Sequence, residues 1–252
     1  MSEPEVLLAS VPASLNQWQR VTNTFSYPSS VFTDIRNGHR SWWLPLAIVV
    51  LFSYIFFAAI SAKVGWEQVT ENALKMNPKS AEQMAQASPY QQETIRKFTH
   101  YSIEGSFAAS PVMVLVFVAL GSAVLLGTIN FVFGGKATFG EVFAVWMYAT
   151  LPGLIKTILG TVVLFTGVAP ESFNLNNFAP TNIGAFLNPS ETNAALYALA
   201  TALDFTTIWS VILLGIGLAT VAKVKRSTGY AAVFGWWVII VIVNVGWQAA
   251  FS

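Results

Sequence analysis

Cysteine is absent from the sequence of 252 residues, and histidine occurs only twice. Disulfide bonds, thiolate metal sites and cysteine nucleophiles are therefore excluded. His39 and His100 are isolated, and the sequence contains no Gly-x-Ser-x-Gly, His-Glu-x-x-His or dinucleotide-binding motif. We therefore predict a non-enzymatic protein that has no cofactor and no catalytic, cofactor-binding or metal-binding residue.

One stretch resembles a phosphate-binding loop but is incomplete. A Walker loop needs a first glycine and a final Ser or Thr after Gly-Lys, because its glycine-rich backbone surrounds the phosphate and the hydroxyl binds magnesium. Here Asn130 stands at the first position and Ala137 at the last. The pattern indicates a tight turn after a membrane helix and not a nucleotide site.

Charge is also scarce, since charged residues make up 10% of the chain and hydrophobic residues 54%. Soluble domains carry about 25% charged residues, so this chain cannot cover a water-exposed surface in the usual way. The net charge is +1. No overall basic field would attract nucleic acid, and we expect no nucleic-acid partner.

Long apolar runs take the place of the missing charge. Each is long enough, at about 1.5 Å per residue, to cross a hydrocarbon core of about 30 Å. The sequence therefore predicts an all-α polytopic membrane protein with the lipid bilayer as its first partner. The five expected transmembrane helices cover residues 42–62, 107–133, 142–167, 205–222 and 230–250.

The remaining segments suggest a flexible tail over residues 1–25 and a single membrane domain over 26–252. Residues 26–38 are expected to form an interfacial helix, with Val31, Phe32 and Ile35 on one face. Two long outer loops, 65–105 and 168–203, separate the spans, and the first should form a helical cap. From residue 190 to 222 the pattern is consistent with one continuous helix.

Positive charge predicts the orientation. The short loop after the fourth span carries Lys223, Lys225 and Arg226, whereas residues 168–203 carry no Lys or Arg. Cytoplasmic loops are enriched in these residues. We expect a cytoplasmic N-terminus and an outside C-terminus.

The third span contains the most unusual residues. Lys156 lies well inside it, and Asp204 at the outer end of the fourth span is the carboxylate that could pair with it. An ionisable residue inside a membrane is a functional hypothesis by default. A structural pair and a transport or proton-relay pair are both consistent with the pattern. Pro152 and Gly153 predict a kink in the same helix.

Small residues at four-residue spacing indicate where helices approach one another closely. Packing in a bundle accounts for them more simply than a pore lining does. The candidate packing positions are Ala149, Gly153, Thr157 and Thr161 in the third span, Ala119, Ala123 and Gly127 in the second, and Gly215 and Ala219 in the fourth.

Three stretches together resemble one family of membrane proteins. They are Tyr-Pro-Ser-Ser-Val-Phe before the first span, FGGKATFGEVFAVWMYATLPGLI through the third, and LDFTTIW with GIGLATVAKVKRSTG around the fourth. In this order, with five spans, the chain resembles the bacterial branch of the Yip (Ypt/Rab-interacting protein) family over roughly residues 18–250. The resemblance implies a five-helix domain with its N-terminus inside, in a bacterial cell (inner) membrane. Eukaryotic relatives are linked to vesicle trafficking and Rab-type GTPases, but their Asp-Leu-Tyr-Gly-Pro motif is absent here.

Two functions remain. The first is a membrane scaffold or adaptor that organises membrane components or trafficking, with other membrane proteins as partners and a homo-oligomer left open. The alternative is a small-solute or lipid transporter or channel that uses the kinked third helix and the polar pair Lys156 and Asp204.

Overall fold

The computed structural model describes residues 14–76, 78–189 and 191–251, and within these ranges the chain is built from helices without a strand. Five helical stretches are long and apolar enough to cross a membrane, which confirms the predicted fold class. These spans are α3 (Trp43–Lys63), α7 (Ser110–Gly127) with the π-helical turn Thr128–Val132, α8 (Phe139–Ala149) with α9 (Gly153–Thr166), α11 (Phe205–Ala222) and α12 (Arg226–Phe251).

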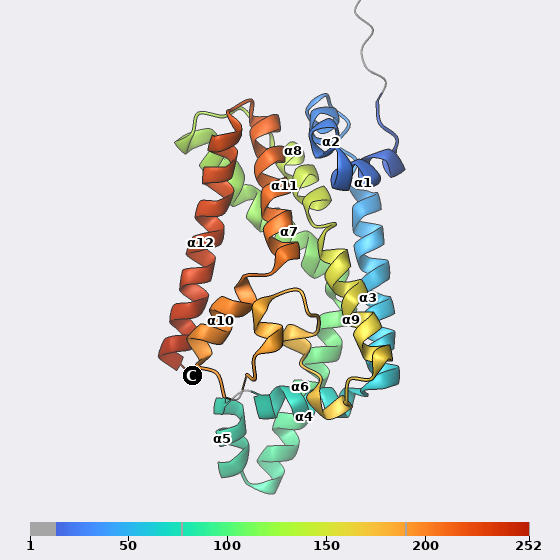
Figure 1. Ribbon diagram of the computed structural model, residues 1–252, viewed down its shortest axis with the longest axis vertical. Coiled ribbons are helices and arrows are strands. Elements are labelled where there is room, and N and C mark those ends of the chain that lie inside the picture. The colour runs from blue at the N-terminus through green and yellow to red at the C-terminus, as the bar shows by residue number, and fades with distance from the viewer. Residues whose placement is uncertain (1–13, 77, 190, 252) are drawn as a thin grey trace, which may run out of the picture.

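Of the remaining helices, α10 (Ala194–Ala202) lies between α9 and α12, and the other α-helices occupy the two ends of this bundle (Figure 1). At one end, here the α1/α2 end, lie α1 (Gln17–Ser26) and α2 (Pro28–Arg36). At the opposite end lie three helices that we call the cap, and α12 finishes at the same end. The described chain therefore starts and finishes at opposite ends, as an odd number of spans requires. The cap consists of α4 (Trp66–Met76), α5 (Pro78–Gln86) and α6 (Pro89–Ala108).

The flexible tail predicted for residues 1–25 is wrong for residues 17–25, which belong to α1. Asn16 caps this helix through a reciprocal capping box with Gln19, which satisfies two backbone N–H groups at the helix start. Arg20 in α1 is buried against Asp34 of α2, with Nε 2.6 Å from the carboxylate. The predicted start of the membrane domain, residue 26, is too late because the sequence of α1 is mostly polar and gives no sign of this buried contact. Residues 1–13 lie outside the described residues.

Helix α2 packs into the bundle and not only onto its surface. Val31, Phe32 and Ile35, predicted to share one face, are fully buried in the main hydrophobic core. A Cβ placed on Gly217 of α11 would overlap Val145 of α8 and lie 3.0 Å from Phe32. The apolar face therefore contacts protein, because α8 and α11 leave a space that only a glycine at 217 keeps open.

The expected packing stripe of the second span is also wrong. Ala123 is exposed, and nothing lies within 4 Å of the position that a Cβ on Gly127 would take. The buried face of α7 instead carries Val118, Ser122 and Leu125. Next to it, Gly121 touches the indole of Trp146 from α8 so closely that a Cβ would overlap the ring. Ala119, the remaining residue of the predicted stripe, is only half-buried. The face of α7 that meets α8 therefore differs from the predicted stripe.

Helices α11 and α12 make the closest helix contact of the bundle described here. A Cβ on Gly229 of α12 would overlap the carbonyl oxygen of Gly215 and lie 2.7 Å from the Cβ of Ala219. The predicted packing residues Gly215 and Ala219 thus lie where the two backbones meet, although the glycine opposite them, Gly229, was not singled out. Small residues allow this approach.

Candidate functional site

The third span is interrupted at mid-length, where α8 ends at Ala149 and α9 begins at Gly153. Pro152 has no N–H to donate into a helix, and residues 150–152 form turns in which Leu151 N donates to Tyr148 O. The expected kink residues Pro152 and Gly153 therefore lie at a break between two helices. No heavy atom comes within 4 Å of a Cβ on Gly153, so this glycine belongs to the break and not to a packed interface.

Lys156 lies one turn after this break and reaches the start of α11. Its ammonium nitrogen is 3.0 Å from Oδ2 of Asp204. The Lys156 side chain is one quarter exposed, whereas that of Asp204 is almost fully buried. The structure thus brings together the two ionisable residues that the sequence singled out, inside the bundle and away from both ends.

Asp204 also explains why residues 190–222 do not form one helix, as the sequence suggested. α10 (Ala194–Ala202) ends before it, and Asp204 is the N-cap of α11. Its Oδ1 accepts hydrogen bonds from the backbone N–H groups of Thr206, at 2.9 Å, and Thr207, at 3.2 Å. Aspartate favours this position because its carboxylate satisfies amides that have no partner within the helix. Residue 190, the expected cap of the continuous helix, lies outside the described residues.

Two threonine hydroxyls complete the environment of the carboxylate. Thr181 Oγ1 donates to Oδ2 and Thr206 Oγ1 to Oδ1, both at 2.6 Å. Both threonines are buried. Asp204 therefore accepts five hydrogen bonds, of which Lys156 supplies one. We call Lys156, Asp204, Thr181 and Thr206 the polar cluster.

Thr181 belongs to the irregular segment 167–193, which returns from the end of α9 into the bundle. Phe205 N donates to Thr181 O at 3.0 Å, and Asn182 forms an isolated bridge with Asp204. Asn177 and Asn182 exchange side-chain hydrogen bonds, at 2.7 and 3.4 Å. Irregular backbone at membrane depth is tolerated only where protein or water satisfies its polar groups. Asparagine side chains do so here, since Asn182 Oδ1 accepts from Ala185 N at 3.0 Å and Asn72 Nδ2 donates to Pro170 O and Phe173 O.

A family model described as the Yip1 domain matches residues 22–247, which include four spans, most of the fifth and the polar cluster. The chain belongs to the Yip1 domain family. No curated protein and no solved structure matches it.

One aromatic ring of this Yip1 domain covers the polar cluster. The Lys156 ammonium lies 5.5 Å from the centroid of the Phe178 ring, which is within the range of a cation–π interaction. Phe178 packs on Phe56 of α3, with ring centroids 4.5 Å apart, and a Cβ on Gly160 would overlap it. Phe178 also lines a cavity of about 550 Å³ among residues of the irregular segment. A single side chain thus contacts both the lysine and a cavity.

The other predicted packing residues of the third span are placed less uniformly. Ala149 is buried, whereas Thr157 and Thr161 are half-buried. Their hydroxyls donate to carbonyls of their own helix, Gly153 O at 3.4 Å and Thr157 O at 2.8 Å. The tightest contact of α9 lies instead at Gly160, which was not predicted.

Sequence reasoning missed three residues of the site: Thr181, Thr206 and Phe178. A signal for Thr206 existed, because Asp-Phe-Thr-Thr before an apolar run is a helix-start pattern. None existed for Thr181 or Phe178, which reach Asp204 and Lys156 from a segment without periodicity. Among the described residues, no group of three His, Asp or Glu side chains could hold a metal ion.

Proposed function

We propose that this member of the Yip1 domain family is a non-enzymatic scaffold or adaptor that organises other membrane proteins. The observation that supports it most is the unequal burial of the spans. In the most apolar stretch of α11, 56% of the residues are buried, compared with 28% in the first and third spans, 22% in the second and 17% in α12. Four of the five spans thus have most of these residues at least partly exposed, where lipids or helices of other proteins can contact them.

The outward face of α7 is a defined surface. Val112, Met113, Val116, Phe117, Leu120 and Val124 are all exposed. Association of helices in a membrane depends on van der Waals packing and not on the hydrophobic effect, so a ridged face of this kind offers contacts that a neighbouring helix can fit. The buried polar cluster supports the same function, because it holds the bundle in one shape.

The test is capture of partners by the full chain from native membranes, with and without photo-crosslinking at the α7 face. The double variant Phe117→Ala/Leu120→Ala should lose its partners. Phe131→Ala, which alters a side chain that is 91% exposed in the turn after α7, is the matched control. Recovery of no partner from native membranes, together with unchanged membrane composition after deletion, would contradict a scaffold.

We also propose that the protein lies in a bacterial cell membrane with its α1/α2 end in the cytoplasm. Arg36, Lys136 and the basic loop after α11 lie at that end, and cytoplasmic loops are enriched in Lys and Arg. The absence of cysteine makes the test direct. Asn37→Cys and Gln86→Cys each introduce one exposed thiol, the first after α2 and the second in the cap. An impermeant maleimide should label only Gln86→Cys in intact cells, and labelling of Asn37→Cys alone would reverse the assignment.

The second candidate function is transport of a small solute or lipid. It is favoured by one observation: Phe178 contacts Lys156 and also lines a cavity. Movement of this ring would connect the cavity with the polar cluster beside the broken third span. Flux into liposomes should then be lost in Lys156→Met and kept in Lys75→Ala, an exposed lysine of the cap. Absence of flux over a broad panel of solutes and lipids would exclude this function.

A further inference from the structure

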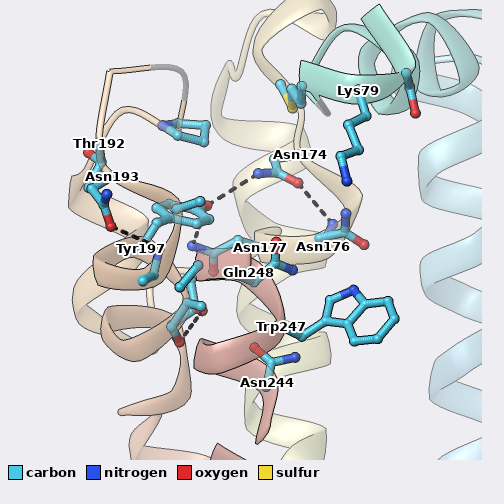
Figure 2. Close-up of a pocket in the computed structure, with 18 of the residues that line it drawn as sticks. Lys79, Asn174, Asn176, Asn177, Thr192, Asn193, Tyr197, Asn244, Trp247 and Gln248 are labelled. Carbon is cyan, nitrogen blue, oxygen red and sulfur yellow. Dashed lines mark hydrogen bonds between the residues drawn. The ribbon is translucent and has the colours of Figure 1, made fainter. Parts of the chain in front are cut away.

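A second cavity lies away from the polar cluster, at the cap end. It has a volume of about 950 Å³ and is enclosed by α5, α10, the end of α12 and the part of the irregular segment around residues 174–177. Figure 2 shows labelled side chains from all four elements converging on it. Amides dominate its polar lining, with Asn174, Asn176, Asn177, Asn193, Asn244 and Gln248.

This lining has a specific hydrogen-bonding character. An amide side chain both donates and accepts, as do the hydroxyls of Tyr197 and Thr201, which also line the cavity. Among the described lining residues none is acidic, and one, Lys79, is basic. Hydroxyl groups of a ligand also donate and accept, so they match such a lining on both sides. A bare phosphate only accepts and would leave the amide oxygens without partners.

The internal hydrogen bonds keep some of these amides in place. Tyr197 OH accepts from Asn174 Nδ2 at 3.3 Å and from Asn177 Nδ2 at 3.2 Å. The side chain of Asn193 caps α10 by accepting from the amides of Ala195 and Leu196. The cavity is therefore formed before a ligand arrives, which lowers the ordering cost of binding.

The position of the cavity along α12 indicates the kind of ligand. Asn244 and Trp247 both line it, and both are exposed. One turn earlier on the same helix, Ile240 and Val243 are exposed, at 62% and 63%. Because residues four apart share a helix face, a polar cavity and an apolar strip follow each other along one side of α12.

The indole of Trp247 adds a flat apolar surface to this polar site. Its side chain is 62% exposed, and Figure 2 shows the ring at the edge of the cavity. Tryptophan is enriched at membrane–water interfaces, where one part of the ring contacts lipid and the indole N–H contacts polar groups. A sugar ring can contact such a surface through its C–H groups while its hydroxyls bind the amides.

We propose that this cavity binds the headgroup of a glycolipid, with the sugar among the amides and beside Trp247 and the acyl chains along Ile240 and Val243. A lipid fits better than a free sugar because the apolar strip continues directly from the cavity. The site does not require the chain to recruit other proteins, so it stands or fails separately from the scaffold function.

The experiment uses the full chain in phosphatidylcholine nanodiscs that contain increasing amounts of monoglucosyl diacylglycerol, with bound lipid counted by native mass spectrometry. The glucolipid should bind about tenfold more tightly than phosphatidylcholine, the equivalent of one or two neutral hydrogen bonds. Asn244→Leu should weaken binding about three- to tenfold, and Asn244→Gln should restore it in part. Trp247→Leu should weaken it similarly.

Trp18→Leu is the matched control, because Trp18 in α1 is 64% exposed and lies at the opposite end of the bundle. It should bind the glucolipid as the unaltered chain does. Thermal melting checks that each variant is folded. The proposal is overturned if phosphatidylcholine binds equally well, if Trp18→Leu loses as much affinity as Trp247→Leu, or if phosphatidylglycerol is preferred over the glucolipid. Equal affinity for free methyl glucoside would show a site for a soluble sugar and would also overturn it.

Discussion

Near α1 and α2, the spans contact one another through side chains that leave almost no space, as where Phe32 and Val145 meet at Gly217. Near the cap, the space between α9 and α12 is instead occupied by the irregular segment and α10 (Figure 1). Side-chain hydrogen bonds hold this region, and Asp204 alone accepts five, of which three are buried. We call these the packed half and the hydrogen-bonded half.

The difference follows from how each half satisfies its backbone. Helices form their own hydrogen bonds, so the spans of the packed half depend mainly on surfaces that fit, and glycine at 215, 217 and 229 provides them. The buried ion pair of this half, Arg20 with Asp34, joins α1 to α2 and does not join two spans. The irregular segment has no such internal ladder and depends on side chains of Asn, Thr and Asp. Mutations should therefore act through steric overlap in one half and through unsatisfied polar groups in the other.

The largest effect is expected from Asp204→Leu. This change removes the cap of α11, the partner of Lys156 and the acceptor of Thr181 at once. A charge that loses its buried partner typically costs about 3–5 kcal/mol. We expect a strong decrease in the melting temperature of the detergent-solubilised protein.

Lys156→Met is the informative companion to this variant. Asp204 would keep four of its donors, so the loss should be only about 1–2 kcal/mol. Exposure acts in the opposite direction, because the lysine left unpaired by Asp204→Leu is 26% exposed whereas the aspartate left unpaired by Lys156→Met is 3% exposed. The asymmetry therefore depends on the four donors that continue to stabilise the carboxylate. Equal destabilisation by the two changes would show that the ion pair, and not the cap and hydroxyl network, holds the hydrogen-bonded half.

The next largest effect is expected in the packed half, from Gly229→Leu. The new side chain would meet the carbonyl oxygen of Gly215 and the Cβ of Ala219. Overpacking of this kind costs about 1–3 kcal/mol, and more where backbone must move. Thermal melting measures it.

Gly235→Leu, on the same helix, is the control for this variant. No heavy atom lies within 4 Å of a Cβ at position 235, so the same substitution should leave the melting temperature nearly unchanged. If both leucine variants melt alike, close approach of α11 and α12 does not define the packed half.

The two halves also differ in how much of them the sequence predicted. The spans were predictable because length and absence of charge are properties of a single segment. The pairing of Lys156 and Asp204 was predictable for a related reason: few buried charges exist, so few combinations compete. The contact positions between helices were harder to predict, because small residues lie on several faces of each helix. For α7 the stripe at Ala119 and Ala123 was preferred to Gly121, which makes the contact.

The irregular segment could not be predicted in any detail. Its fold depends on hydrogen bonds between residues far apart in sequence, such as Asn72 to Phe173 and Thr181 to Asp204. Asparagine-rich composition indicates turns but not which carbonyl each amide will reach. The same limit applies to the cavity beside α12, which needs four separate elements to exist.

A smaller effect is expected from Asn72→Leu, where the cap meets the irregular segment. The buried amide of Asn72 donates to Pro170 O at 2.7 Å and to Phe173 O at 2.9 Å. Its loss leaves two carbonyls without this donor and should cost about 1–3 kcal/mol. Limited proteolysis should then cut within residues 167–193 faster than in the unaltered chain. Protection as before would mean that the cap does not hold this segment.

The smallest effect is expected from Thr181→Val, which keeps the shape of the side chain and removes one donor to Asp204. Hydrogen bonds between membrane helices are worth about 0.6 kcal/mol on average, and four donors to the carboxylate remain. Thr220→Val in the packed half is the control. The Thr220 hydroxyl donates to Ile216 O within its own helix. This carbonyl lies in the hydrogen-bonded backbone of α11, so it needs the hydroxyl less. Thr181→Val should lower the melting temperature slightly and Thr220→Val not at all. If the order is reversed, the division into a packed and a hydrogen-bonded half is wrong, because a hydroxyl would then count for more where helices already satisfy their own backbone.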